Sequence, residues 1–446
     1  MSQSPSKLRS PEDLKTLRET LICSANDGRR CLKLCAGGSC LASGALDVET
    51  ALKQKLAASG LNETVKISHT GCMGPCVVGP VMLMDDGTFY QGLRPNDAED
   101  IVDCHLLEGK RVDRLIVQSM DQQESYPTQT DIAFFNRQKK VVLRRCGSID
   151  PDSLEDAICA GDYQPVAKAL HQLTPEQIIE DVKKSGLRGR GGAGFPTWVK
   201  WNLTKREVSD QKYVLCNADE GDPGAYMDRS VLEGDPHSVI EGMILGAYAI
   251  GASKGFAYIR AEYPLAVERF QRAINHARER GLLGEDILGS GFSFDLEIRM
   301  GSGAFVCGEE TALIASIEGK RGEPRTRPPF PAHKGLWDKP TVLNNVETFA
   351  NVAAIFDMGA DVFAANGTEK SKGTKVFALA GSVRNTGLVE VPIGTTLGEL
   401  IYEIGGGIVG CLGPAAGADL FLSRPGGNRP SGTSRPDGRD PCTRTG

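Results

Sequence analysis

The chain of 446 residues has no apolar run long enough to cross a bilayer. Its most apolar stretch, residues 239–252, is interrupted by Glu241 and predicts a buried helix. The first twenty residues are polar and lack the apolar core that a secretory signal requires. We therefore expect a cytoplasmic protein with no direct membrane span.

Positive charge is also scarce. The chain carries 51 Lys and Arg against 57 Asp and Glu, a net charge of −6 with His neutral. No basic stripe stands out from this acidic background, so we expect no nucleic-acid partner. Cysteine is abundant by contrast. Thirteen thiols in a chain without an export signal are expected to stay reduced, which favours metal ligands or buried small side chains over disulfides.

Changes in composition divide the chain into six segments. Strand-like and helix-like runs alternate in two of them, which predicts α/β folds. We expect, in chain order, a flexible leader over 1–20, a compact α/β unit over 21–118, a polar linker over 119–140, a large α/β domain over 141–370, a small ubiquitin-like α+β unit over 371–410, and a Gly- and Pro-rich tail over 411–446 that cannot bury enough surface to fold.

Four cysteines form two pairs, Cys35-x4-Cys40 and Cys72-x3-Cys76, each in the loop after an expected strand. One helix and one strand separate the loops, so the pairs can converge. Four thiolates suit either a tetrahedral zinc or an iron–sulfur cluster. The spacing favours [2Fe–2S], because structural zinc pairs are usually closer and the glycines of both loops let N–H groups approach bridging sulfides. Four unrelated cysteines are the least favoured alternative.

The densest glycine run lies between residues 186 and 194, where five of nine residues are glycine. Gly189, Gly191 and Gly194 satisfy G-x-G-x-x-G, but a capping box at Thr174 predicts a helix before the run, whereas an ordinary dinucleotide turn follows a strand. Such a loop can wrap a phosphate, because its N–H groups turn toward an anion. Matching charge is available from Arg188, Arg190 and Lys200. An exposed loop without a ligand is the alternative for this motif alone.

Three further segments place polar groups at expected strand ends and helix starts. Residues 213–229 are a strand, expected over 213–216, that runs into an acidic loop. Residues 300–314 contain a strand over 305–307, a turn at Gly308 and a helix with two glutamates in its first turn. Asn344 and Asn345 precede another helix, as caps or as donors to a ring edge. Carboxylates at the carboxyl end of an open α/β sheet can accept bonds from sugar or ribityl hydroxyls. The alternatives are a solvated acidic turn and simple helix stabilisation.

The chain resembles the NADH-oxidising flavoprotein subunit of respiratory complex I and the diaphorase subunits of NAD(P)-linked hydrogenases and formate dehydrogenases. The resemblance is carried by the runs G-L-R-G-R-G-G-A-G-F-P, N-A-D-E-G-D-P-G-A-Y-M-D-R, C-G-E-E-T-A-L-I and N-N-V-E-T, and it covers residues 20–410. It implies a thioredoxin-like [2Fe–2S] domain, a Rossmann-like α/β domain for flavin and NADH, and a truncated ubiquitin-like α+β domain of the SLBB type. The N-terminal cluster domain is fused to the flavoprotein in the soluble relatives, which favours a soluble complex.

The resemblance implies FMN, NAD(H) and [2Fe–2S] as cofactors. The residues that it places at FMN are Gly189, Gly191, Lys200, Asn217, Asp219, Glu220, Gly308, Glu309, Asn344 and Asn345. The predicted cofactor-binding set also includes Arg190, Gly192 and Phe305. The residues that would face NADH are Phe195, Glu310, Arg327 and Phe330. The ligands of the cluster would be Cys35, Cys40, Cys72 and Cys76. No catalytic side chain is expected, because the flavin performs the chemistry, and Glu310 is the nearest candidate.

The family continues into a helical domain in which a C-x2-C-x2-C motif and a later cysteine bind [4Fe–4S]. Only Cys411 and Cys442 follow here, so that cluster's ligands are absent and we expect an aberrant tail.

The resulting prediction is an NADH:acceptor oxidoreductase (diaphorase) flavoprotein subunit that passes electrons between NAD(H), FMN and iron–sulfur clusters in a soluble complex. Its partners would be a small [2Fe–2S] subunit and the catalytic subunit of a hydrogenase or formate dehydrogenase. The alternatives are a [2Fe–2S] electron-transfer or assembly module with a non-functional flavin site, the flavin subunit of an NADH-quinone oxidoreductase, and a zinc-stapled nucleotide-binding scaffold.

Overall fold

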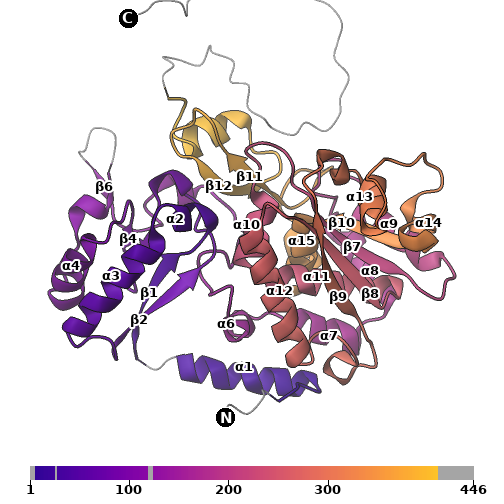
Figure 1. Ribbon diagram of the computed structural model, residues 1–446, viewed down its shortest axis with the longest axis horizontal. Coiled ribbons are helices and arrows are strands. Elements are labelled where there is room, and N and C mark those ends of the chain that lie inside the picture. The colour runs from indigo at the N-terminus through magenta and orange to yellow at the C-terminus, as the bar shows by residue number, and fades with distance from the viewer. Residues whose placement is uncertain (1–5, 26–27, 119–123, 410–446) are drawn as a thin grey trace, which may run out of the picture.

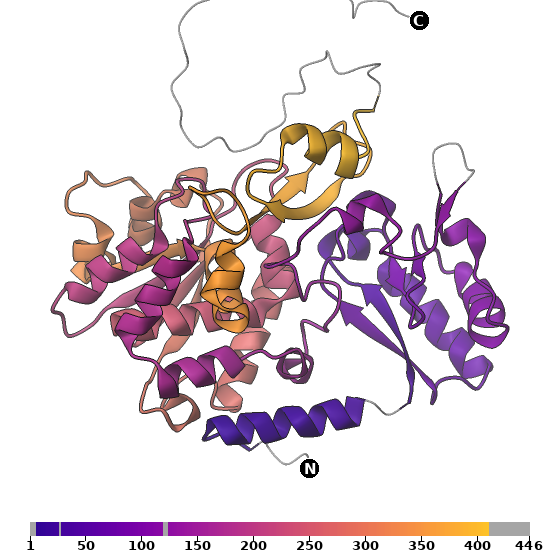
Figure 2. The same ribbon diagram turned by 180° about the vertical axis from the view of Figure 1, so that it is seen from behind.

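The computed structural model describes residues 6–25, 28–118 and 124–409. Two large units lie side by side, and a small third unit lies over their junction (Figures 1 and 2). The tail predicted over 411–446 falls outside the described residues. Among the described residues, no helix combines the length and the apolarity needed to cross a bilayer.

The first unit is built on a mixed sheet of order β2-β1-β3-β4. Strand β1 (Arg30–Cys35) is parallel to β2 (Val65–Thr70) and antiparallel to β3 (Met82–Leu83), which pairs with β4 (Phe89–Tyr90). Helices α2 (Gly38–Ala42), α3 (Ala45–Ala58) and α4 (Asp97–Asp100) complete it, and α4 continues into a π-helical segment over Ile101–Leu107. The sequence predicts strands over 31–35, 64–68 and 81–84 and helices over 46–59 and 97–107. The structure has a strand or helix at each of these places, although β3 is shorter than predicted.

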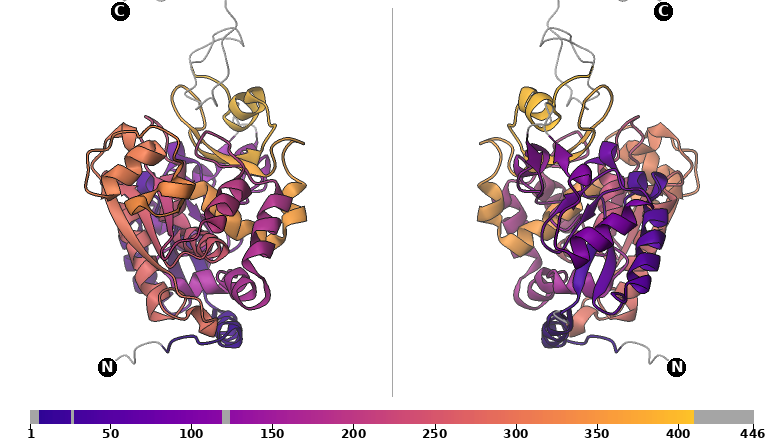
Figure 3. Two further views of the ribbon diagram at one scale, coloured as in Figure 1. Left: turned by 90° about the vertical axis from the view of Figure 1, so that its right-hand side faces the viewer. Right: turned by 90° about the vertical axis from the view of Figure 1, so that its left-hand side faces the viewer.

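The flexible leader predicted over 1–20 is wrong from Pro11 onwards, where helix α1 (Pro11–Ala25) begins. The Ser10 hydroxyl accepts the N–H of Asp13 at 3.1 Å and caps the helix. Leu14 is fully buried, and Leu17 and Leu21 pack against the core of the second unit at helical spacing. Helix α1 therefore packs under the second unit, at the opposite end of the molecule from the third unit (Figures 1 and 3).

The linker predicted over 119–140 is also shorter than expected. Strand β5 (Val117–Gln118) pairs with β6 (Ser125–Tyr126), and α5 (Ala133–Asn136) follows. Phe134 is 3% exposed and belongs to the core of the first unit. The apolar side chains of this segment therefore attach it to that unit.

The second unit contains a parallel sheet of order β10-β7-β8-β9: β7 (Tyr213–Ala218), β8 (Lys254–Arg260), β9 (Asp295–Gly301) and β10 (Thr341–Asn345). Alternate side chains of β7 pack into different cores, Val214 on one face and Leu215 on the other, so both faces are covered. One face meets α11 (Pro236–Ile250) and α15 (Val346–Met358), and the other meets α13 (Glu310–Ile317). Helix α11 is the buried helix expected around 239–252.

The remaining helices of this unit are α6 (Leu154–Cys159), α7 (Gln164–Gln172), α8 (Pro175–Ser185), α9 (Thr197–Arg206), α10 (Met227–Gly234), α12 (Pro264–Glu279), α14 (Pro331–Lys334) and α16 (Ala360–Ala364). The strand predicted over 305–307 is wrong, because Phe305–Gly308 is a turn of 3₁₀ helix after β9. Phe305 is 66% exposed, so this short apolar run never enters the sheet.

The third unit is a hairpin of β11 (Thr374–Leu379) and β12 (Gly387–Pro392), followed by a π-helical segment over Glu399–Ile404. Thr396 and Glu399, which the sequence predicts as the cap of a helix in this unit, bond to each other: Thr396 Oγ1 accepts the N–H of Glu399 at 3.2 Å, and Glu399 accepts the N–H of Thr396 at 2.7 Å. Leu379, Val389 and Leu400 lie in the core of the first unit. The third unit is thus continuous with that core.

Candidate functional site

The predicted ligand edge lies at the carboxyl end of the parallel sheet. In the strand register, Asn217 of β7 stands between Asn345 of β10 and Tyr258 of β8. The acidic loop after β7, the segment after β9 and the start of α15 therefore meet at one edge, as ligand sites of open α/β sheets do.

Asp219 carries a buried carboxylate oxygen with no hydrogen-bond partner in the structure. Its Oδ1 accepts from Arg260 at 3.1 Å, whereas its Oδ2 has no partner among the described residues. Burial raises the pKa of this carboxyl, and Arg260 opposes that shift. A Cβ on Gly308 would lie 3.7 Å from Oδ2, and the Gly308 carbonyl accepts from Asn217 at 3.0 Å. Asn217, Asp219 and Gly308 thus leave a free acceptor for a ligand hydroxyl.

The two glutamates of α13 have different roles. Glu309 is the N-cap, and its Oε2 accepts the N–H groups of Thr311 at 2.9 Å and Ala312 at 3.0 Å. The carboxylate of Glu310 accepts hydrogen bonds from the ammonium of Lys200 at 3.1 Å and from the guanidinium of Arg327 at 2.5 Å. Two cations from two different predicted segments therefore converge on Glu310.

The glycine loop packs against the start of α15. Helix α8 ends at Gly186 with φ 67°, after the predicted capping box of Thr174 and Gln177. A Cβ on Gly191 would lie 3.1 Å from Cβ of Asn345, so glycine is needed for this approach. Asn345 caps α15 by accepting the N–H of Glu347 at 2.9 Å.

The two other glycines of the predicted set, Gly189 and Gly192, lie in the same loop, where the N–H of Gly189 donates to the Phe195 carbonyl at 2.9 Å. Asn344, the neighbour of the α15 cap, is buried and accepts from the Trp201 indole at 2.9 Å. That contact commits the Asn344 amide oxygen to the protein interior.

The structure does not support the phosphate contact predicted for the Arg190 guanidinium. This side chain is 6% exposed and donates to the carbonyls of Arg188 at 2.7 Å, Lys372 at 2.6 Å and Thr374 at 2.9 Å. Three carbonyls, one in the loop, one just before β11 and one in its first residue, occupy the donors that the sequence analysis assigned to an anion. Arg190 therefore ties the glycine loop to the third unit.

Glu220 is also engaged with the protein. Its two carboxylate oxygens accept the N–H groups of Asp228 and Arg229, each at 3.1 Å, at the start of α10. Burial raises the pKa of Glu220, and the backbone donors oppose that rise. A contact between Glu220 and FMN stays a prediction.

Three aromatic side chains from the predicted set are exposed: Phe195 at 46%, Phe305 at 66% and Phe330 at 51%. Phe305 lies over the acidic loop, where a Cβ on Gly221 would come within 2.8 Å of its ring and of Arg260. Exposed rings beside charged loops are available for stacking on a planar ligand.

The four predicted ligand cysteines converge at one point. All four line one cavity, and the sulfurs of Cys72 and Cys76 are 3.9 Å apart. Hydrogen bonds from Cys40 and Cys72 lower the pKa of Cys35, and the hydrogen bond with Cys35 raises the pKa of Cys40. Four thiols in one cavity supply the donor set of a [2Fe–2S] cluster.

Helix α10 joins the cysteine loops to the predicted ligand edge of the sheet. Its start is capped by Glu220, and at its end a Cβ on Gly71 would overlap Cα of Gly234. Tyr226, just before the helix, donates its hydroxyl to the Leu379 carbonyl at 3.5 Å and interacts electrostatically with Cys76. Tyr226, Arg260 and Asp228 were not singled out from the sequence. Of these, Arg260 was detectable, because it directly follows the strand that the sequence predicts over 256–259.

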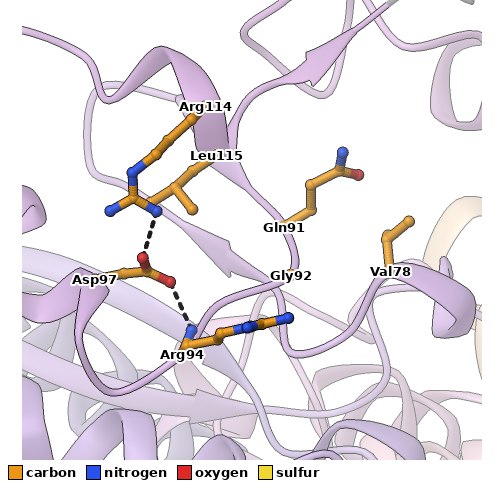
Figure 4. A pocket seen from close by; sticks show the side chains of 7 residues that line it. All are labelled: Val78, Gln91, Gly92, Arg94, Asp97, Arg114 and Leu115. Carbon is orange, nitrogen blue, oxygen red and sulfur yellow. Dashed lines mark hydrogen bonds and ion pairs between the residues drawn. The ribbon is translucent and has the colours of Figure 1, made fainter.

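A pocket on the first unit lies away from these groups. Its lining includes Gln91 and Val78, and Asp97 within it accepts from Arg114 and from the N–H of Arg94 at 2.7 Å (Figure 4). It contains none of the residues predicted for a cofactor, so we do not assign it to the flavin or the nicotinamide.

The fold and both sites define a flavin- and cluster-binding redox protein, and comparison with known proteins agrees. Residues 182–354 match the Nuo51 FMN-binding domain, residues 20–105 the thioredoxin-like [2Fe-2S] ferredoxin family and residues 376–429 the SLBB domain. The chain belongs to the Nuo51-type family of FMN-binding flavoproteins, here with an N-terminal thioredoxin-like [2Fe–2S] domain. The predicted family, the fold class and the cofactors FMN and [2Fe–2S] are confirmed.

Three curated relatives illustrate the range of the family. The chain is 62% identical over 271 residues to the NADP-reducing hydrogenase subunit HndC of Solidesulfovibrio fructosivorans, covering 61% of this chain and 55% of the relative. It is 48% identical to an NADH-quinone oxidoreductase subunit of Rhizobium meliloti (64% and 67%) and 42% identical to the NAD-reducing hydrogenase HoxS subunit alpha of Cupriavidus necator (75% and 54%). The chain thus spans between half and two thirds of their lengths.

Among solved structures, an air-oxidised NAD+-reducing [NiFe]-hydrogenase matches with a TM-score of 0.52 and 30% identity, over 89% of this chain and 68% of the other.

Proposed function

We propose that the chain oxidises NADH or NADPH at FMN and passes the electrons to its [2Fe–2S] cluster, as the flavoprotein subunit of a soluble NAD(P)-linked hydrogenase. The observation that carries this proposal is the free, buried Oδ2 of Asp219 beside Gly308 at the sheet edge. A buried acceptor of this kind fits a ligand hydroxyl, and the ribityl arm of FMN supplies hydroxyls.

The chain's own residues would position the reactants. FMN, when bound, accepts hydride and releases electrons singly. Asn217 and Asp219 would hold its polar arm, and Lys200 beside Glu310 would supply positive charge near its phosphate or ring. Phe195 and Phe330 are exposed and free to stack on the nicotinamide or adenine of the dinucleotide. No proton transfer from a side chain is required.

Hydrogenase partners are supported by the names of the relatives. Two of the three relatives described above are hydrogenase subunits, and so is the matching solved structure. We propose a hydrogenase catalytic subunit and a small [2Fe–2S] subunit as partners. If the chain instead co-purified with a formate dehydrogenase subunit or with quinone-linked subunits, it would belong to one of those two kinds of complex.

The test is anaerobic reconstitution of the full chain with FMN, iron and sulfide. We expect stoichiometric FMN, loss of flavin absorbance on addition of NADH or NADPH, and catalytic reduction of ferricyanide. A preparation with cluster absorbance that binds no FMN would overturn the proposal in favour of a cluster module, and zinc without iron or sulfide would indicate the zinc scaffold.

A further inference from the structure

The β11–β12 hairpin contacts both cofactor loops. At its turn, the N–H of Leu388 donates to the Gly74 carbonyl at 3.0 Å, and the N–H of Cys76 donates to the Thr386 carbonyl at 3.1 Å. At its open end, Arg190 of the glycine loop donates to the Thr374 carbonyl. In Figure 1 the hairpin lies above the junction of the two large units, where it can hold both loops.

Lys375, the second residue of β11, brings a cation to a group of buried carboxylates. Its ammonium forms an ion pair with Glu347, which is 1% exposed. The other oxygen of Glu347 accepts the N–H of Val376 at 2.9 Å. Glu220 and Asp228, both buried, also interact electrostatically with Lys375. One ammonium therefore pairs with Glu347 and acts through space on two further buried carboxylates.

These carboxylates support the loops predicted to hold FMN. Glu220, next to Asp219, accepts the N–H of Asp228. Asp228 in turn accepts from the side chain of Asn345, which packs against Gly191 of the glycine loop. Burial, followed by repulsion from Glu220, raises the pKa of Asp228, and Lys375 opposes the rise. The position of each loop thus depends on how the charge of this group is balanced.

We propose that Lys375 is a positioning residue of the flavin site, supplied by the third unit, whose ammonium offsets the charge of Glu220, Asp228 and Glu347 and fixes the loops that they support. The identity of the ligand rests on the proposed function, but the positioning of the loops does not. Removal of one partner of a buried charge group leaves the others uncompensated, so the loops would separate. Negative charge left beside a bound flavin would also oppose its reduction.

The first experiment needs no cofactor. Amide hydrogen exchange of the full chain compares Lys375→Met with Lys375→Arg and with Lys370→Met, an exposed lysine of the preceding segment. We expect the amides of Asp228 and Arg229 to exchange at least roughly tenfold faster in Lys375→Met, and at the wild-type rate in both other variants.

A compensating variant guards against simple misfolding. Lys375→Met combined with Glu347→Gln removes charge and countercharge together and should restore much of the protection. Unchanged exchange in Lys375→Met, or no restoration in the double variant, would overturn the inference whether or not the protein binds flavin.

The second experiment reports on the flavin. In Lys375→Met we expect FMN to bind roughly tenfold more weakly. The balance between oxidised and reduced flavin should shift roughly tenfold toward the oxidised form, about 30 mV for two electrons. Lys375→Arg should restore both values. A wild-type chain that binds no FMN would refute the proposed function and leave the exchange result decisive for Lys375, whereas bound FMN with an unchanged potential in Lys375→Met would contradict the electrostatic part.

Discussion

The electrostatic setting of Asp219 makes it the most informative single residue of the flavin edge. Its side chain is 1% exposed and has one oxygen on Arg260 and the other free. Asparagine keeps an oxygen that can accept from Arg260, but it puts an NH₂ group, which cannot accept a hydrogen bond, in place of the free carboxylate oxygen. Asp219→Asn should therefore weaken FMN binding by roughly tenfold. Fluorescence titration of the reconstituted chain with FMN measures the effect.

Asp210→Asn is the matched control, since Asp210 is an exposed carboxylate before the amino end of the same strand. Equal FMN affinities in the two variants would show that Asp219 does not contact the flavin.

A single substitution at Gly79 tests the cysteine site in the same way. A Cβ on this residue would lie 2.9 Å from Sγ of Cys40, closer than ordinary contact, so Gly79→Ala should displace that thiol. We expect the iron and acid-labile sulfide content to fall several-fold while FMN binding is retained. Gly398→Ala, which meets only Thr396 Oγ1 at 3.8 Å, is the control, and full cluster occupancy in Gly79→Ala would contradict the predicted ligand role of Cys40.

Single elements show what the sequence could reveal. The capping box at Thr174 and the cap at Asn345 are local, since donor and acceptor lie within three residues of each other, and both were predictable. The convergence of the four cysteines was also predictable, because two loops after neighbouring parallel strands end at the same side of a sheet.

Other features depend on contacts between distant segments. The sequence shows Arg190 beside glycines, which suggests an anion, but two of its three acceptors are carbonyls about 180 residues away in the third unit. Lys375 and Glu347 are likewise joined across two units. The run 305–307 was misassigned because three apolar residues fit a strand and a 3₁₀ turn equally well.

Arg190 carries a prediction at the scale of the element, because it attaches the glycine loop to the segment that leads into β11. Lysine keeps the charge but has a single ammonium in place of the planar fork, so Arg190→Lys should lose two of the three bonds to carbonyls. We expect the free energy of unfolding to fall by about 1–3 kcal/mol in urea titration. Arg206→Lys, at an exposed position in the last turn of α9, should leave it unchanged, and an equal loss in both variants would contradict the role of Arg190.

At the scale of the whole molecule, the three units are held by shared interiors. The third unit contributes Leu379 and Val389 to the core of the first, and α1 contributes Leu14 to the core of the second. Glu390 of β12 accepts the N–H groups of Val141, Val142 and Leu143 at 2.8–2.9 Å. Unfolding one unit alone would expose large apolar surfaces of its neighbours, so we expect the units to unfold together. A charge buried in one unit then changes the free energy of unfolding of the whole chain.

The second unit holds a group of buried charged side chains around the first two turns of α11. Asp162, Asp235 and Glu241 are fully buried, and Arg145 pairs with Asp162 and lies 4.0 Å from Asp235. Burial raises the pKa of Asp162 to about 6, and burial followed by repulsion from Asp162 raises that of Glu241 well above its usual range. Acids with raised pKa values bind more protons in the folded than in the unfolded chain.

Stability should consequently fall as the pH rises from the ordinary carboxyl pKa near 4 through about 6, and the raised pKa of Glu241 should extend the fall to higher pH. Arg144 and Arg145 bring two positive charges to the group, but both also pair with the partly exposed carboxylate of Asp357, so the buried acids are not balanced.

Glu241→Gln should remove much of this loss. Its amide oxygen can still accept the N–H of Tyr163, which donates to Glu241 at 2.6 Å, and its new N–H₂ can donate to Asp162, whose oxygens lack hydrogen-bond partners in the described structure. The variant should therefore be more stable than wild type at pH 8 by about 1–3 kcal/mol and show a flatter pH dependence between 4 and 7. Urea unfolding at a series of pH values measures both, with the exposed Glu268→Gln as control. A variant less stable than wild type at pH 8 would show that Glu241 is charged in the folded protein and that Arg145 stabilises it.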